Sequence, residues 1–325
     1  MSDMKLRIFF IFFSLLILQK VFSQQSGPIA LSCQDKFGNA LCFTKGGSLL
    51  GYSDGRNVQI RSTIDSSLSA LLSNGHKDRI LALDISNDSS MIVTGGRDSL
   101  LILWDISKQR LIRKLNYHKG KVTTVRFDPS GNYIYSGSTD KRLICYSIKE
   151  DKIVFDKKVH LDDILSIDVS RDGKFLASGG VDKCVYIFDA ISGDLIQNLG
   201  HFRNWIRCVR FSPNGSTLAT CCDNGNIFFW GKKYSHVFEL INKEKLSMRW
   251  ITGIDFCDDN SSFAYSMENG TAGFRTHGFK YIYKAGHPIR MVKNQPGTGS
   301  FISFAIITSG GGVLFIKGKS LILKN

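Results

Sequence analysis

The sequence GGRDSLLILWD at residues 95–105 returns as GGVDKCVYIFD at residues 179–189, which begins 84 residues later. Halfway between them, residues 137–147 read GSTDKRLICYS. A phrase that recurs about every 42 residues identifies an internal repeat, and periods of this size are typical of stacked or circular repeat architectures. We therefore treat the repeat as the unit that decides the fold.

One repeat unit has the alternating pattern of short, half-buried strands. After His118 the strand-like runs KVTTVRF (121–127), YIYSGS (133–138), RLICYSI (142–148) and KIVFDKK (152–158) are separated by turn sequences such as DPSGN and TDK. Aspartate, glycine, serine and asparagine favour tight turns between antiparallel strands. A four-stranded sheet of this size cannot bury both faces alone, but it can do so between copies of itself.

Three residue types mark the repeat at fixed distances. The histidines are spaced by 42, 42 and 41 residues, an aspartate follows each of them after 22 residues, and an aromatic residue comes next. The histidines are His76, His118, His160 and His201; the aspartates are Asp98, Asp140, Asp182 and Asp223; the aromatics are Trp104, Tyr146, Phe188 and Trp230. Gly75-His76 with Trp104-Asp105, and Gly200-His201 with Trp230, resemble WD40 repeats. The resemblance is strong over about residues 76–230.

The resemblance implies a buried, hydrogen-bonded group in each repeat, made by the histidine, a strand hydroxyl, the turn aspartate and the tryptophan. The implied hydroxyl partners are Thr94, Ser136, Ser178 and Thr220. Tyr146 and Phe188 replace tryptophan in two repeats. Because the Phe188 ring has no hydrogen-bonding atom, that repeat is expected to depend more on packing.

The flanking sequence continues the same count, so we expect an all-β, seven-bladed propeller over residues 28–325, with four antiparallel strands per blade. The expected blades are about 34–75, 76–117, 118–159, 160–200, 201–242, 243–285 and 286–325. Two terminal strands compete to complete the last blade, residues 29–33 (IALSC) and residues 321–324 (LILK). Closure by the N-terminal strand is favoured, since it is the usual closure of this family.

Residues 1–23 form a separate segment. Lys5 and Arg7 precede an apolar run from Ile8 to Leu18, which is shorter than the roughly 20 residues that a membrane span needs. A basic start, a short apolar core and a small residue at the cut are typical of a secretory signal peptide, and we expect cleavage after Ser23. The Phe-Ser-Gln-Gln junction resembles exported proteins of the Bacteroidetes. The mature chain would then lie in the periplasm, outer envelope or medium, without a transmembrane anchor; a retained anchor and a cytoplasmic protein are the alternatives.

The sequence offers no catalytic constellation. The histidines and aspartates follow the structural spacing of the repeat, whereas catalysis needs one convergent site. No motif for a nucleophile elbow, a phosphate loop, a zinc site or a paired-cysteine metal site occurs, and no cofactor or small-molecule substrate is expected. The eight cysteines permit disulfides in an exported chain, with Cys208 close to Cys221 or Cys222, although most lie inside strands. An enzyme site in the central channel is the alternative.

The charge favours an acidic partner. The formal net charge is +14, and the signal segment carries Lys5, Arg7 and Lys20 against Asp3, so the mature chain keeps +12. No acidic residue follows Glu268, and eight basic residues lie beyond it. Nucleic acid is a poor candidate, because no strip of alternating aromatic and basic residues appears. We expect a monomeric propeller that acts within a complex as a scaffold for protein partners.

In the WD40 family, the loop after each histidine and the residue before each turn aspartate lie on one face of the disc. This resemblance places five candidate partner-binding residues there: Arg79, Arg97, Lys121, Asp163 and Trp205. Trp205 is the most specific of them, since large aromatic side chains dominate binding energy at protein interfaces. Packing between blades is the alternative role for this tryptophan.

Overall fold

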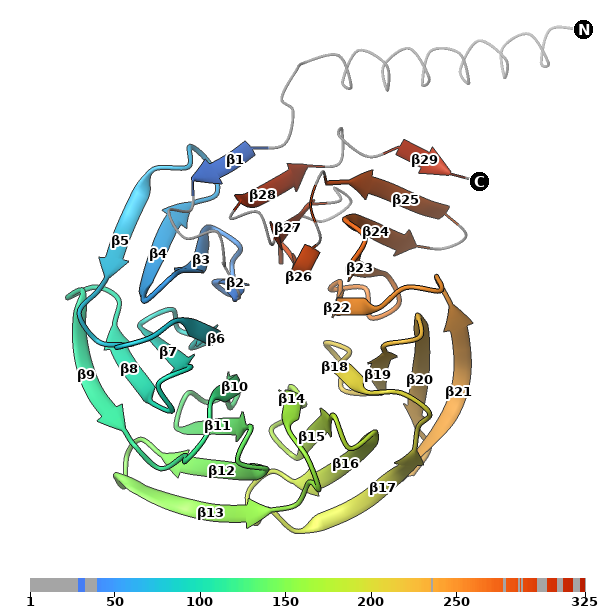
Figure 1. Cartoon of the computed structure of the whole chain (residues 1–325), viewed down its shortest axis with the longest axis horizontal. Helices are drawn as coiled ribbons and strands as arrows, with labels where there is room; N and C mark the ends of the chain where they lie inside the picture. The colour runs from blue at the N-terminus through green and yellow to red at the C-terminus, as the bar shows by residue number, and fades with distance from the viewer. Residues whose placement is uncertain are drawn as a thin grey trace, which may run out of the picture.

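The computed structural model describes residues 29–32, 40–234, 236–276, 279–285, 287, 289–296, 303–308, 312–317 and 322–324. Seven small sheets stand around a central channel like the blades of a propeller (Figure 1). The expected signal segment and its cleavage site lie outside the described residues. None of the described segments forms a helix with the length and apolar character that crossing a bilayer requires.

Each blade is a meander of antiparallel strands whose first strand lines the channel. The first three blades are β2–β5, β6–β9 and β10–β13, and the next two are β14–β17 and β18–β21. Their strands are β2 (Leu41–Phe43), β3 (Leu49–Asp54), β4 (Asn57–Ser62), β5 (Leu68–Leu72), β6 (Ile80–Ile85), β7 (Met91–Gly96), β8 (Leu101–Asp105), β9 (Arg110–Leu115), β10 (Val122–Phe127), β11 (Tyr133–Ser138), β12 (Arg142–Ser147), β13 (Lys152–Lys158), β14 (Ile164–Val169), β15 (Phe175–Gly180), β16 (Cys184–Asp189), β17 (Leu195–His201), β18 (Ile206–Phe211), β19 (Thr217–Cys222), β20 (Asn226–Lys232) and β21 (Phe238–Lys245).

The two ends of the chain are placed in different blades. The sixth blade is β22 (Ile251–Phe256), β23 (Phe263–Met267), β24 (Thr271–Thr276) and β25 (Phe279–Lys284), and the seventh contains β26 (Ile289–Asn294), β27 (Ser303–Thr308) and β28 (Gly312–Lys317). The N-terminal strand β1 (Ile29–Ser32) pairs with β28, so closure by the N-terminal strand is confirmed. β29 (Ile322–Lys324) instead pairs with β25 and becomes a fifth strand of the sixth blade. The expected seventh blade, 286–325, therefore ends before β29.

The meander fixes which loops share a face of the disc. The loop from the last strand of one blade to the first strand of the next lies beside the turn between the second and third strands. Backbone hydrogen bonds from Arg97 to Arg79 (2.8 Å) and from Asp223 to Trp205 (3.2 Å) join these two sets of loops. We call this side the entry face, because every channel strand begins there, and the opposite side the exit face.

Three blades contain the buried polar group that the repeat spacing predicts. In the second blade His76 lies 2.7 Å from the Thr94 hydroxyl and 3.0 Å from Asp98, and Trp104 donates to Thr94 at 2.9 Å. The third and fourth blades bring together His118 with Ser136 and Asp140, and His160 with Ser178 and Asp182. Each group links the entry-face loop to a buried strand and so fixes the loop.

The aromatic member differs between these blades. The Tyr146 hydroxyl lies outside the hydrogen-bonded group of its blade: it accepts a bond from Arg113 at 2.7 Å and donates to Asp151. The Phe188 ring is buried and packs without a hydrogen bond, as expected from its chemistry. Only Trp104, among these three, closes the group with its indole N–H.

We expect acid to weaken the fold through these groups. Burial opposes ionisation of Asp140, but the hydrogen bond from His118 and the Lys119 backbone N–H hold the pKa of this carboxyl well below its usual range. The same combination lowers the pKa of Asp98 and Asp182. A lowered folded-state pKa contributes stability above the unfolded value of about 4 and loses it as the pH falls further. Urea midpoints should therefore drop between pH 5 and pH 3.

The variant Asp140→Asn tests this assignment. It should cost about 2 kcal/mol at pH 7, because a charge-assisted hydrogen bond is lost, and its acid-induced decline should be shallower than that of the wild type. Urea titrations at pH 7, 5 and 3 measure both quantities. A pH dependence equal to the wild type would remove Asp140 from the explanation.

Candidate functional site: the entry face and the channel mouth

The entry face is basic at its surface. In the described loops of this face the most exposed charged residues are cations, and the acidic residues are partly buried, although the Asp78 side chain is 47% exposed and lies 3.8 Å from Arg97. The exposed cations are Arg56, Lys77, Arg97, Lys119, Lys121, Arg203 and Arg249. Their combined field reaches about 8–10 Å at physiological salt and attracts acidic groups.

The same face carries large apolar side chains on three neighbouring blades. Leu161 is 81% exposed and Met248 is 79% exposed, while Trp205 and Trp250 are 40% and 43% exposed. All four lie in loops that lead into the channel strands β14, β18 and β22. Clustered apolar anchors with a basic surround are typical of a surface that binds another protein.

A stacked arrangement fixes the two tryptophans. The guanidinium carbon of Arg207 lies 5.0 Å from the centre of the Trp205 ring and 5.1 Å from that of Trp250. Asp223 holds Arg207 in place through two contacts, at 2.5 Å and 3.2 Å. The cation therefore holds two indoles that would otherwise be mobile, so less side-chain entropy is lost when a partner binds.

The five residues predicted to bind partners share the entry face but do not form one cluster. Arg97 is exposed, with its guanidinium 3.8 Å from Asp78, and Lys121 is exposed on the next blade. Arg79 and Asp163 are partly buried, and burial together with Asp162 raises the pKa of Asp163. Of the five, only Trp205 belongs to the stacked arrangement.

Sequence reasoning missed Trp250 and Arg207. Trp250 precedes Asp255 of its channel strand by five residues, and Trp205 precedes Arg210 by the same five. The two tryptophans are therefore equivalent positions of neighbouring blades. Alignment on the channel strands, rather than on the histidines, would have found the pair.

The fifth blade departs from the predicted polar group. In the three preceding blades the histidine lies eight residues before the charged residue of the channel strand, but His201 lies nine before Arg210. Asp223 follows Arg210 by 13 residues, where the other turn aspartates follow by 14. Phe202 and Asn224 therefore occupy the histidine and aspartate positions of this blade.

The contacts of the displaced residues agree with this register. Asp223 binds Arg207 instead of a histidine. His201 is the last residue of β17, and its ring lies 3.5 Å from the sulfur of Cys184 on β16. Asn224 takes over the turn by accepting the Asn226 backbone N–H at 3.2 Å. His201 and Asp223 thus do not join Thr220 and Trp230 as the sequence predicted.

The remaining two members of that group do meet. Trp230 donates its indole N–H to the Thr220 hydroxyl at 3.1 Å. The Phe202 ring packs edge-on against Phe228 at 5.0 Å and Trp230 at 6.0 Å. Aromatic packing thus replaces the histidine–aspartate contact of the group. The sequence did not reveal this change, because His201 and Asp223 are both shifted by one residue and so keep the spacing of 22.

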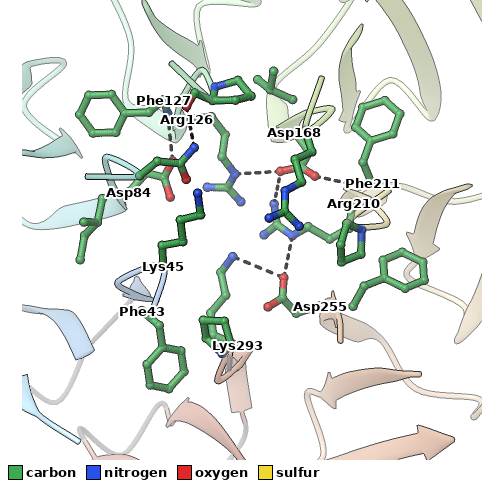
Figure 2. A pocket seen from close by; sticks show the side chains of 18 of the residues that line it. Phe43, Lys45, Asp84, Arg126, Phe127, Asp168, Arg210, Phe211, Asp255 and Lys293 are labelled. Atoms are coloured by element: carbon green, nitrogen blue, oxygen red, sulfur yellow. Dashed lines mark hydrogen bonds and ion pairs between the residues drawn. The ribbon is translucent and has the colours of Figure 1, made fainter. Parts of the chain in front are cut away.

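A ring of alternating charge lines the channel near the exit face (Figure 2). Six of the seven channel strands contribute one charged residue near their ends: Asp84, Arg126, Asp168, Arg210, Asp255 and Lys293. Burial opposes ionisation of Asp168, but the Arg210 and Arg126 guanidiniums lower the pKa of its carboxyl below the usual range. Arg126 and Arg210 lie 3.0 Å and 2.8 Å from the same carboxylate oxygen.

The acids of the ring also bind the neighbouring blade. Asp84, Asp168 and Asp255 accept the backbone N–H groups of Phe127, Phe211 and Asn294, at 2.9, 2.8 and 3.0 Å. Each acid thus links two successive channel strands across a blade boundary. The ring is a structural belt of the disc as well as the lining of its mouth.

The seventh position of the ring is neutral. Cys42 lies 42 residues before Asp84 and occupies the matching place on β2. Burial and, to a lesser extent, Asp84 raise the pKa of the Cys42 thiol well above its ordinary value, so the group is uncharged at neutral pH. A closed ring of seven charges would have to place two charges of the same sign side by side. The neutral Cys42 between Lys293 and Asp84 avoids that repulsion.

A cavity of about 550 Å³ opens at this mouth, with the ring at its floor. Figure 2 shows Lys45 extending into it from the first blade, towards the ring. The histidines and turn aspartates of the repeat give no sign of this polar ring, although the ring residues follow the same period: Asp84, Arg126 and Asp168 are 42 residues apart. The carboxylate of Asp168 is committed to two guanidiniums and a backbone N–H, so it has a poor arrangement for a general base.

The cysteines lie mainly inside strands, as the sequence indicated. Cys42, Cys145, Cys184, Cys208, Cys221, Cys222 and Cys257 are free thiols in the part of the chain that the structure describes. Cys208 lies opposite Cys221 in the register of β18 and β19. Burial raises the pKa of Cys145 and Cys222 to about 12, so these thiols are protonated and unreactive at neutral pH.

Comparison with known families agrees with the blades described above. The family model for the WD domain, G-beta repeat, matches residues 67–105, 109–147, 152–189 and 193–231. This chain belongs to the WD40-repeat family of β-propellers. Each match begins on the outer strand of one blade and continues through the first three strands of the next, so the four together run from β5 to β20. They include the blade whose histidine and aspartate positions hold Phe202 and Asn224.

Solved structures share the fold without sharing much sequence. The β-propeller domain of Cps50 (Swd1) from Myceliophteria thermophila superposes with a TM-score of 0.75 at 14% identity, covering 89% of this chain and 98% of that domain. No curated protein gives a significant match to the sequence. Propellers of this WD40 family commonly act as protein-interaction scaffolds, and the likeness in fold does not choose among partners.

Proposed function

We propose that this WD40 propeller is an exported, non-catalytic scaffold that binds an acidic protein partner through its entry face. The observation that carries the proposal is the stacked Trp205–Arg207–Trp250 arrangement, which is partly exposed on a face whose most exposed charged residues are cations. Anchored aromatics supply binding energy, and the surrounding cations select acidic partners and speed their association. The Asp168 carboxylate in the channel ring is already bonded to two guanidiniums and a backbone N–H, which favours a binding role over a catalytic role.

A photo-crosslinking experiment identifies the partner and the face together. A benzophenone amino acid at Met248 places the probe beside the tryptophans without removing them. The matched control carries the probe at Ile191, which is 66% exposed in the turn between β16 and β17 on the exit face. We expect one protein to crosslink to the Met248 probe and not to the Ile191 probe.

The tryptophans should then dominate the affinity for that partner. Trp205→Ala and Trp250→Ala should each weaken binding by about 30-fold, corresponding to roughly 2 kcal/mol for a central aromatic anchor. Ile191→Ala is the control and should leave the dissociation constant unchanged. Calorimetry with the purified partner measures all three variants; wild-type affinity in both tryptophan variants would contradict the proposed surface.

Export is supported by the sequence of residues 1–23, with its basic start and short apolar run. We expect the native protein to have an intact mass that begins at Gln24 and to be found in the envelope or extracellular fraction. Mass spectrometry of fractionated cells measures this. A full-length mass in the cytosolic fraction would contradict export while leaving the binding surface to be judged on its own test.

A further inference from the structure

The fifth blade has Asn224 at the turn position where three other blades have an aspartate, since its own turn carboxylate, Asp223, is shifted by one residue and binds Arg207. A groove lies beside Asn224. The groove has a volume of about 780 Å³, and its lining includes Arg203, Asn224, Asn226, Phe228, Lys243 and Lys245. We call it the blade-five groove. Asn224 stands where the second, third and fourth blades have Asp98, Asp140 and Asp182, so the groove is missing the negative charge of those blades.

The charge of the groove is uncompensated. Arg203, Lys243 and Lys245 are exposed, no acidic residue lines the groove, and no ion pair joins any of the three cations to a described residue. Two other cations of this part of the chain do have acidic partners: Arg207 binds Asp223, and Lys233 lies 2.8 Å from Glu239. Three cations on one groove without an ion pair, beside a turn whose only carboxylate is paired with Arg207, point to an anionic ligand.

The two lysines define the shape of that ligand. Lys243 and Lys245 are alternate residues of β21, opposite Phe228 and Asn226 of β20. Alternate side chains of a strand lie on one face about 7 Å apart. Lys243 is held by the Phe228 ring, whose centre lies 5.0 Å from the ammonium, and Arg203 contributes from the loop between β17 and β18. The cations therefore line a length of groove instead of converging on one point.

We propose that the blade-five groove binds an extended acidic peptide segment with carboxylates at alternate residues. Such a segment repeats at the same spacing of about 7 Å as Lys243 and Lys245, so both lysines can pair with it at once. Arg203 is two residues from Trp205, so the segment would continue directly onto the tryptophan pair. The inference rests on the proposed function, because it specifies the part of the acidic partner that lies beside its apolar anchor.

A peptide-binding experiment on the purified mature chain tests the groove without the natural partner. The probe is a fluorescein-labelled peptide of alternating glutamate and valine, with an alternating glutamine and valine peptide as the uncharged control. Fluorescence anisotropy should show binding of the glutamate peptide alone. Raising NaCl from 50 to 500 mM should weaken this binding at least tenfold, because the pairs are exposed to solvent.

Two groove variants make the test specific. Lys243→Gln with Lys245→Gln should weaken binding of the glutamate peptide at least tenfold. Asn224→Asp should do the same by returning a carboxylate to the groove, and it introduces the residue that three other blades carry at this turn, so the fold accommodates it. Lys157→Gln, on the outer strand β13, is the matched control and should bind like the wild type.

Three outcomes overturn the inference: unchanged affinity in both groove variants, equal binding of the glutamine peptide, or competition by equimolar inorganic phosphate, which would indicate a compact oxyanion site. The proposed function fails differently. If the peptide binds through the groove but no protein crosslinks at Met248, the scaffold proposal fails alone. If the tryptophan variants lose the partner while the groove variants keep both peptide and partner, the groove inference fails alone.

Discussion

Asp168→Asn should lower the free energy of unfolding by about 3–5 kcal/mol, because it removes the charge that two buried guanidiniums share. Arg126 and Arg210 lie 3.0 Å and 2.8 Å from one oxygen of this carboxylate. The other oxygen accepts the Phe211 backbone N–H at 2.8 Å, and the asparagine amide oxygen can keep that bond. The loss therefore reports the charge, and urea unfolding followed by tryptophan fluorescence measures it.

Asp194→Asn is the matched control for this prediction. Asp194 lies 3.0 Å from Lys157, a distance like those in the ring, but its side chain is 75% exposed. Water screens such a pair, so the midpoint of unfolding should stay at the wild-type value. If both variants lose equally little free energy of unfolding, water screens the charges of the ring and their pairing does not stabilise the fold. The ring would then not be a structural belt.

The general fold follows from the sequence because the repeat is a local signal. Each blade repeats its turns and its alternating strands, so the number of blades and their strands could be counted along the chain. Strand pairing at the chain ends is not a local signal. The sequence left two segments competing for one place, and the structure gives β1 to the seventh blade and adds β29 to the outer edge of the sixth.

The site was harder to predict, because the histidines were used to set the register. A histidine on an entry-face loop shifts its sequence position when the loop gains a residue, as happens before β18. The charged residues of the channel strands cannot shift in this way, since they are buried and each must meet its neighbour. Counted from Arg210, Asn224 and Trp250 fall on the positions that the structure gives them, and the shift of the fifth blade's turn carboxylate by one residue becomes visible.

Gly225→Ala should destabilise the protein by more than about 3 kcal/mol and disturb the binding face at the same time. Gly225 has φ of +78°, and a methyl group there would meet the carbonyl oxygens of Ser247 and Arg249 well inside van der Waals contact. Both atoms belong to the backbone of the loop that carries Trp250, so relief of the clash requires that loop to move. Left-handed backbone alone costs about 1–2 kcal/mol for alanine, and the backbone clash adds to it.

Gly131→Ala separates these two contributions. Gly131 has φ of +75°, but a methyl group there has only the Ser86 Cβ nearby, at 3.9 Å. This control should cost about 1–2 kcal/mol in urea unfolding and leave partner binding unchanged. Gly225→Ala should lose more stability and, if it folds, should bind the crosslinked partner more weakly, because Trp250 no longer stacks on Arg207. Equal losses in the two variants would show that the Trp250 loop moves aside freely and does not depend on the turn at Gly225.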